Sequence, residues 1–187
     1  MILILMGAPG AGKGTQSKTL VDSLSIIQIS TGDILRSAVE GESSLGLEAK
    51  AYLTAGNLVP DEIVIKIIEE RIILDDCKKG FILDGFPRTR EQAVALDEIL
   101  KKNNMSLNSV VFIDVPEKEL ITRLLKRAEI ENRPDDNLLV IKNRLEVFKK
   151  KIEGLLGYYK EKNLLKFVDG TGNSPEVNSR IVRALGI

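Results

Sequence analysis

The first sixteen residues constrain the fold more than any other stretch of the chain. Six apolar residues, Met1–Met6, precede a glycine-rich segment, Gly7–Gln16, that contains Lys13. The apolar run predicts a short buried strand, because it is too short to cross a membrane as a helix. The glycines let the chain turn tightly around an anion, and a helix after the loop would add its dipole. We therefore expect a nucleotide phosphate to bind here, beside the positive charge of Lys13.

This loop is a variant of the P-loop pattern. Its spacing matches G-x-x-x-x-G-K, but Gly14 stands where a hydroxyl residue is usual, and Thr15 follows one position later. A mobile glycine loop between a strand and a helix is the alternative interpretation. The coincidence of strand, spacing, lysine and hydroxyl argues against that alternative.

Composition limits the possible functions. The chain has 187 residues, enough for one medium domain, and 27 basic residues balance 27 acidic ones, which argues against a general nucleic-acid binder. It has no histidine, which excludes a histidine base or metal ligand, and its single cysteine, Cys77, excludes an internal disulfide and a cysteine-rich zinc site. Without a basic leader or a long apolar run, we expect a cytoplasmic protein with no membrane partner. From the neutral charge and the lack of an obvious apolar patch we expect a monomer, with no nucleic-acid partner.

Apolar runs alternate with helical patterns along the chain. This order predicts an α/β fold with a mostly parallel sheet flanked by helices. The expected strands are residues 1–6, 26–29, 81–84, 110–115 and 164–168. Residues 30–59 contain no strand and are interpreted as a small helical insertion. We expect a helix at 117–127, a loop at 128–136, and a long helix that Asp136 caps.

Two functional side chains are expected after the strand at 81–84. Asp84 ends this strand, at the sheet edge where open α/β sheets bind ligands, so its carboxylate would lie near the phosphate loop and could orient water on Mg²⁺. The alternative is an aspartate that only caps the turn into Gly85. Arg88 follows the turn made by Gly85 and Pro87, and its planar guanidinium suits a phosphate.

Four arginines surround the loop expected at 128–136. Arg123 and Arg127 are four residues apart and share a helix face, Arg133 lies in the loop, and Arg144 lies on the long helix. Each alone would be interpreted as a surface residue. Grouped beside a phosphate loop, they indicate phosphoryl transfer, because arginines stabilise the charge on the non-bridging oxygens.

The chain resembles the adenylate kinases over nearly its whole length. The matching segments are Gly7–Gln16, Ser30–Arg36, Gly56–Asp61, Asp84–Thr89 with Gln92, Arg133 with Asp135 and Asp136, Arg144 with Leu145, and Asp169–Thr171. The resemblance implies a P-loop three-layer fold with a five-stranded parallel sheet, in one domain (1–187). It also implies a nucleoside-monophosphate-binding (NMP) segment at 30–59 and a short lid at 126–136. The implied reaction is the reversible, Mg²⁺-dependent conversion of ATP and AMP to two ADP, without zinc.

The resemblance also implies the substrate contacts. The implied ATP-binding residues are Gly10, Ala11, Gly12, Lys13, Gly14, Thr15, Arg127 and Gly172. The implied AMP-binding residues are Thr31, Arg36, Asn57, Leu58, Val59, Gly85, Phe86, Pro87, Arg88, Gln92, Arg133 and Arg144. The implied catalytic residues are Lys13, Arg88, Arg123, Arg127, Arg133 and Arg144.

Thr31 and Gln92 bear on the choice of base. The amide of Gln92 can both donate to and accept from an adenine edge, and relatives that act on UMP or CMP typically carry alanine and asparagine at these two positions. An exposed helix residue is the alternative interpretation of Gln92. A UMP or CMP kinase remains an alternative function, as does a P-loop switch, although the Asn-Lys-x-Asp motif of GTPases is missing. Gly154 departs from the family pattern and costs the long helix about 1 kcal/mol relative to alanine.

Overall fold

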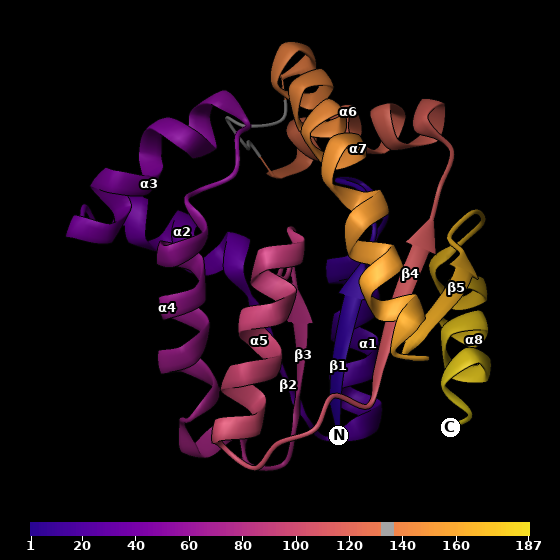
Figure 1. The fold of residues 1–187 in the computed structure, drawn as a ribbon. Coiled ribbons are helices and arrows are strands. Elements are labelled where there is room, and N and C mark those ends of the chain that lie inside the picture. The colour runs from indigo at the N-terminus through magenta and orange to yellow at the C-terminus, as the bar shows by residue number, and fades with distance from the viewer. Residues whose placement is uncertain (132–136) are drawn as a thin grey trace.

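One parallel sheet organises the computed structural model, which describes residues 1–131 and 137–187 (Figure 1). Its strands are β1 (Ile2–Met6), β2 (Ile27–Ser30), β3 (Phe81–Asp84), β4 (Ser109–Asp114) and β5 (Leu165–Asp169). They lie in the order β2-β3-β1-β4-β5, and all neighbouring pairs are parallel. The expected five-stranded parallel sheet is therefore confirmed, with the strand before the phosphate loop at its centre.

Helices cover both faces of this sheet (Figure 1). They are α1 (Lys13–Leu24), α2 (Thr31–Glu40), α3 (Ser44–Ala55), α4 (Asp61–Ile72), α5 (Arg90–Lys102), α6 (Glu117–Glu131), α7 (Leu138–Glu161) and α8 (Ser174–Leu185). A short 3₁₀ helix, η1 (Asp75–Cys77), follows α4. No helix within residues 1–131 or 137–187 has the length and apolar character needed to cross a membrane.

Strand β1 contributes side chains to two hydrophobic cores. Ile2, Ile4 and Met6 pack in a core on one face of the sheet with residues of α4, α5 and α7. Leu3 and Leu5 pack in a second core, on the other face, with residues of α1, α6 and α8. Successive strand residues point to opposite faces, so a strand covered on both sides must be apolar throughout. This explains the unbroken apolar run at the start of the chain.

The strand register brings three strand ends together at one edge of the sheet. Asp84 at the end of β3 pairs with Leu5 of β1 and with Ser30 of β2. Helices α2 and α3 lie beyond this edge on one side, and α6 and the start of α7 lie on the other (Figure 1). Residues 31–59 contain only helices and connections, as expected for an insertion.

Two expectations about the segment after residue 127 were wrong. Helix α6 continues to Glu131, so residues 128–131 are helical and not part of a loop. Alanine and glutamate favour helix, and no glycine or proline interrupts the chain there. The N-cap of α7 is Asn137, not Asp136, because the Asn137 side chain accepts the hydrogen bond from the Val140 N–H at 3.0 Å. Asp136 and Arg133 lie outside the described residues.

Candidate active site

A cavity of about 920 Å³ opens at the carboxyl edge of the sheet. It is lined by the phosphate loop, by α2 and residues 56–59, by residues 84, 85, 87 and 88, and by α6 and α7. Every residue implied to bind substrate that the structure describes lies in this lining, with one exception. The exception is Phe86, which is 1% exposed and packs in the core. Arg133 lies outside the described residues.

The phosphate loop requires glycine at Gly10. This residue has a φ of +85°, and a Cβ there would lie 2.9 Å from Cγ of Leu124. Gly12 then caps α1 in a left-handed conformation, with no side-chain hydrogen bond to the first turn of the helix. The first N–H groups of α1 and the positive end of its dipole consequently face the loop, an arrangement that favours anions.

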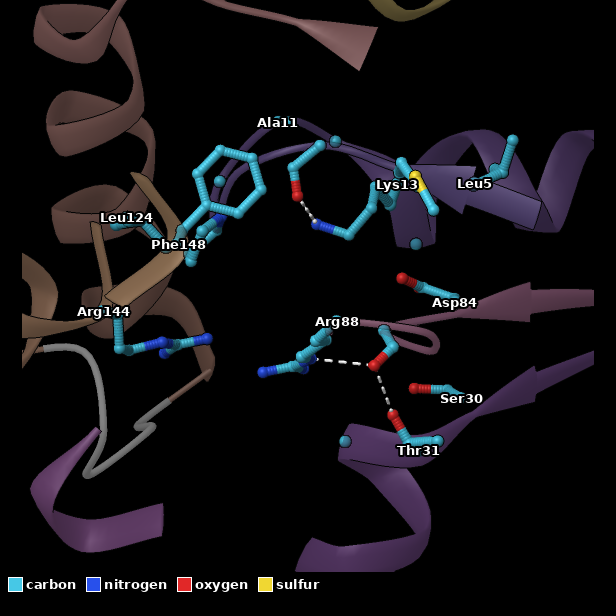
Figure 2. Close-up of a pocket in the computed structure, with 18 of the residues that line it drawn as sticks. Leu5, Ala11, Lys13, Ser30, Thr31, Asp84, Arg88, Leu124, Arg144 and Phe148 are labelled. Carbon is cyan, nitrogen blue, oxygen red and sulfur yellow. Dashed lines mark hydrogen bonds between the residues drawn. The ribbon is translucent and has the colours of Figure 1, made fainter. Parts of the chain in front are cut away.

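Lys13 folds over the loop that it follows. Its Nζ donates hydrogen bonds to the carbonyl oxygens of Gly7 at 2.8 Å and Ala8 at 3.0 Å. Figure 2 shows the Lys13 chain extending across the loop with Asp84 beside it. A flexible amine held in this way is positioned to contact a phosphate that the loop encloses.

Several charged residues act on Lys13 at once. Its pKa is lowered to about 8, mainly because burial disfavours the charged amine. Asp84 opposes this shift by attraction. Three cationic neighbours reinforce it: Arg88, Arg144 and Arg127. Four cationic side chains from different elements thus face one cavity, which is an electrostatic environment suited to phosphate groups.

Asp84 lies next to the phosphate loop, as expected from its place at the end of β3. Its Oδ2 accepts a hydrogen bond from Gln28 Nε2 at 3.1 Å and would be 3.7 Å from a Cβ at Gly14. Sequence reasoning missed Gln28. The only available signal was a polar residue inside the apolar run of β2, and its significance depends on the β2–β3 pairing.

The carbonyl oxygen of Gly85 connects two residues implied to bind AMP. It accepts hydrogen bonds from Thr31 Oγ1 at 3.0 Å and from Arg88 Nε at 2.8 Å, as Figure 2 shows. Thr31 begins α2, whereas Arg88 follows β3, so this one oxygen joins the insertion to the sheet. Gly85 itself has a φ of +80°, a conformation that side-chain-bearing residues rarely adopt.

Gln92 is not an exposed helix residue. It is 1% exposed, it lies at the wall of the cavity, and its Oε1 accepts a hydrogen bond from the Arg88 N–H at 2.7 Å. The alternative interpretation of this residue is therefore wrong. Sequence reasoning also missed Asp61, which contacts the other end of the same amide.

Arginines approach the cavity from both sides. Arg36 pairs with Asp33 and passes over Gly32, where its Nη2 would be 3.1 Å from an added Cβ. Arg123 donates to Glu119 at 2.5 Å and to the Gly170 carbonyl at 2.9 Å. In Figure 2, Arg144 and Arg88 reach toward one another from opposite walls. Like charges converge in this way where they share an anionic ligand.

The insertion is also connected to α7, which was not expected from the sequence. Asn143, next to Arg144, donates hydrogen bonds to residues at the end of α3 and after it. At Gly56, a Cβ would lie 2.8 Å from Val140 Cγ1 and 2.9 Å from Arg144 Cγ. The implied AMP residues Asn57–Val59 are thus adjacent to the helix that bears Arg144.

The β5–α8 connection completes the wall near the phosphate loop. Gly172 lies there with a φ of +93°, followed by a capping box of Asn173 and Glu176. The side-chain amide of Gln16 on α1 donates a hydrogen bond to the Ser174 carbonyl at 3.0 Å. This bond holds the β5–α8 connection against α1.

A phosphate loop after the central strand, with arginines facing it across a cavity, defines a P-loop phosphotransferase. Comparison with known proteins agrees, because residues 5–164 match the family described as adenylate kinase. The adenylate kinase of Leptospira biflexa is 52% identical over 98% of this chain and 98% of its own length. Those of Micrococcus luteus and Thermus thermophilus are each 45% identical, over 98% and 99% of this chain and 89% and 97% of their own lengths.

The chain therefore belongs to the adenylate kinase family. It is a nucleoside monophosphate kinase of the reaction ATP + AMP = 2 ADP, which the comparisons favour over a UMP or CMP kinase and over a P-loop switch.

Proposed function

We propose that this chain performs the transfer with Mg²⁺, by holding two nucleotides so that their phosphates meet between Lys13 and the facing arginines. The observation that carries this assignment is the convergence of Arg88, Arg127 and Arg144 on the surroundings of Lys13. No general base is needed, because the acceptor is already a phosphate anion. Positioning, charge stabilisation and exclusion of water supply the catalysis.

The donor side is built on the phosphate loop. Backbone N–H groups of Gly10–Thr15 and the start of α1 would hold the ATP phosphates, and Lys13 would neutralise part of their charge. Arg127 would contact ATP from α6, and the Gly172 backbone would contact the adenine. The phosphate loop, Arg127 and Gly172 all line the cavity, which supports a shared role in binding one nucleotide.

The acceptor side is built on the insertion and the β3–α5 connection. The residues proposed to bind AMP are Thr31, Arg36, Asn57, Leu58, Val59, Gly85, Pro87, Arg88 and Gln92. Arg88, Arg123 and Arg144 would stabilise the transferring phosphoryl group, together with Arg133 outside the described residues. Phe86 would act through packing, since its side chain lies in the core.

Asp84 fits the requirements of a Mg²⁺ site. Magnesium in phosphotransferases usually keeps several waters and uses one or two carboxylates together with the substrate phosphates. Among residues 1–131 and 137–187, no group of three or more His, Cys, Asp or Glu could hold a metal, whereas Asp84 places a single carboxylate beside the loop. Asp84 would hold the waters of the ion, and the ion would neutralise charge between the phosphates.

Two segments are proposed to close over the substrates. The NMP segment at 30–59 would close over AMP, and the short lid at 126–136 over ATP, which would exclude water as a competing acceptor. We also propose that the protein acts as a cytoplasmic monomer.

The decisive experiment is a coupled assay with ATP, Mg²⁺ and a panel of AMP, UMP, CMP and GMP. We expect AMP to be preferred, and a preference for UMP or CMP would overturn the assignment of Thr31 and Gln92. In the same assay, Lys13→Met should fold normally and lose activity by orders of magnitude. Lys66→Met, an exposed charge loss on α4, is the control and should retain activity. Near-normal turnover of Lys13→Met would remove Lys13 from the reacting phosphates.

A further inference from the structure

Asp61, the first residue of α4, sits behind the cavity wall and holds two residues of the β3–α5 region. Its Oδ1 accepts a hydrogen bond from Gln92 Nε2 at 2.7 Å, and its Oδ2 accepts one from Thr89 Oγ1 at 2.8 Å. Thr89 Oγ1 in turn accepts the Gln92 N–H at 3.1 Å. Among the described residues that line the cavity, Asp61 is absent and Gln92 is present. Of the two partners of Asp61, Gln92 lines the cavity and Thr89 does not, so Gln92 is the residue through which Asp61 can act on a ligand.

The two partners of the Gln92 amide fix which of its ends is oxygen. An ionised carboxylate only accepts hydrogen bonds, so the end that faces Asp61 must be the NH₂ group. A backbone N–H only donates, so the end that faces Arg88 N must be the oxygen. Because Gln92 is 1% exposed, a rotated amide would bury unsatisfied groups against both partners.

The fixed Gln92 amide can make a defined number of further hydrogen bonds. An NH₂ group has two donors and a carbonyl oxygen has two lone pairs, and in the described part of the chain each end of the Gln92 amide has one partner. One donor and one acceptor are left for a base at the cavity wall. Adenine offers the complementary pair, an exocyclic amine that donates and a neighbouring ring nitrogen that accepts.

We propose that Asp61 is a specificity-determining residue that enforces the choice of a 6-amino purine by preventing rotation of the Gln92 amide. The inference rests on the proposed role of Gln92 in AMP binding. Hypoxanthine is the informative competitor, because it has the size of adenine but reverses the hydrogen-bonding pattern at positions 1 and 6. It has an accepting oxygen at position 6 and a donating N–H at position 1, where adenine has a donating amine and an accepting nitrogen. A rotated amide would match hypoxanthine, and Asp61 disfavours that rotation.

The test compares kcat/KM for AMP and for IMP in the wild type, Asp61→Asn and Glu62→Gln. Asparagine keeps the shape of aspartate but can donate or accept, so it tolerates both orientations of Gln92. We expect the AMP/IMP ratio to fall about tenfold or more in Asp61→Asn, with the KM for ATP unchanged. Glu62→Gln is the matched control, because Glu62 is the exposed neighbour in the same helix turn and loses the same charge.

A double-mutant cycle distinguishes positioning from a structural effect. Gln92→Met removes the amide, so adding Asp61→Asn to it should leave the AMP/IMP ratio unchanged. Thermal unfolding checks that each variant is folded, and Asp61→Ser, which also removes the carboxylate, replaces the asparagine variant if that one is unstable. An unchanged ratio in folded Asp61→Asn, or a further fall in the double variant, would overturn the proposal.

The outcome for the wild type keeps this inference separate from the proposed function. A wild type that does not phosphorylate AMP refutes the function itself. A wild type that phosphorylates AMP and IMP equally well refutes specificity through Gln92, and therefore the role of Asp61, while leaving the kinase assignment intact.

Discussion

The side chain of Asn143 on α7 donates a hydrogen bond to the carbonyl oxygen of Ala55, the last residue of α3, at 2.7 Å. A second bond runs from the same nitrogen to Asn57 Oδ1 at 3.0 Å. These bonds connect the C-terminal end of α3 to the helix that carries Arg144. They thereby hold the proposed acceptor segment against the proposed transfer site.

Removing this connection should weaken AMP binding more than ATP binding. Asn143→Ala loses two hydrogen bonds, each contributing about 0.5–1.5 kcal/mol and together about 1–3 kcal/mol, so we expect the KM for AMP to rise roughly five- to 150-fold. The KM for ATP should stay near the wild-type value. Steady-state kinetics with each substrate varied in turn measures both, and Lys142→Ala, an exposed neighbour, is the control. Equal changes in the two KM values would contradict the connection.

The pKa of Lys13 predicts a proton uptake on ATP binding. With its pKa lowered to about 8, the amine is mostly neutral in the free protein at a pH of about 9, whereas a bound phosphate favours the charged form. ATP binding at about pH 9 should therefore take up a proton, and much less uptake is expected at about pH 7. Calorimetric titrations in buffers of different ionisation enthalpy measure the uptake.

Lys13→Arg provides the comparison for that titration. An arginine stays charged throughout this pH range, so the proton uptake on ATP binding at about pH 9 should disappear in the variant. Equal uptake in the wild type and the variant would assign the proton to another group.

Gly85→Ala should damage the proposed acceptor site. A Cβ at this position would lie 2.9 Å from Thr31 Oγ1 and 3.0 Å from Arg88 Nη2, and the positive φ adds about 1–2 kcal/mol of backbone strain. We expect kcat/KM for AMP to fall by roughly a hundredfold. Gly186→Ala shares the positive φ but has open space around it, so its enzyme should be destabilised similarly and remain active. If Gly85→Ala and Gly186→Ala lose similar activity, backbone strain alone would account for the loss in Gly85→Ala.

Gly154→Ala should stabilise the protein. Gly154 lies inside α7, and a Cβ there would meet nothing within 4 Å. Alanine should raise the free energy of unfolding by about 0.5–1 kcal/mol, because glycine loses more conformational freedom in a helix. Urea denaturation measures this change, and Gly157→Ala, at another open position of α7, should repeat it. A lower midpoint in both variants would show that this helix needs its flexibility.

The centre of the sheet was predictable because β1, β3 and β4 are largely buried on both faces. A short, continuous apolar run such as Met1–Met6 is typical of a strand with helices on both sides. The edge strands β2 and β5 are more exposed and each includes a polar residue within its apolar run, yet all five strands were located to within one or two residues. Helix ends were harder. Residues 128–131 are polar enough for a loop and also favourable for a helix, and the choice between neighbouring caps, Asp136 and Asn137, depends on the local backbone geometry.

The site was predictable where its residues are close in sequence. The phosphate loop and the Asp84–Arg88 turn each carry a local pattern, and the structure places both at one cavity. Gln28 and Asn143 carry none, and the matching segment Gly56–Asp61 does not reveal the contact of Asp61 with Gln92. Each of the three is a polar residue whose partners lie 28 to 88 positions away, so its importance appears only when the chain has folded.

The division of β1 between two cores has a consequence for hydrogen exchange. The amides of Leu3–Leu5 lie in the central strand and can be exposed only by disrupting both sides of the sheet, so they are expected to exchange at the rate of global unfolding. Helices α2 and α3 pack mainly on one another and can open locally. Exchange should therefore separate a slow sheet core that carries the phosphate loop from a faster helical segment that is proposed to face the monophosphate.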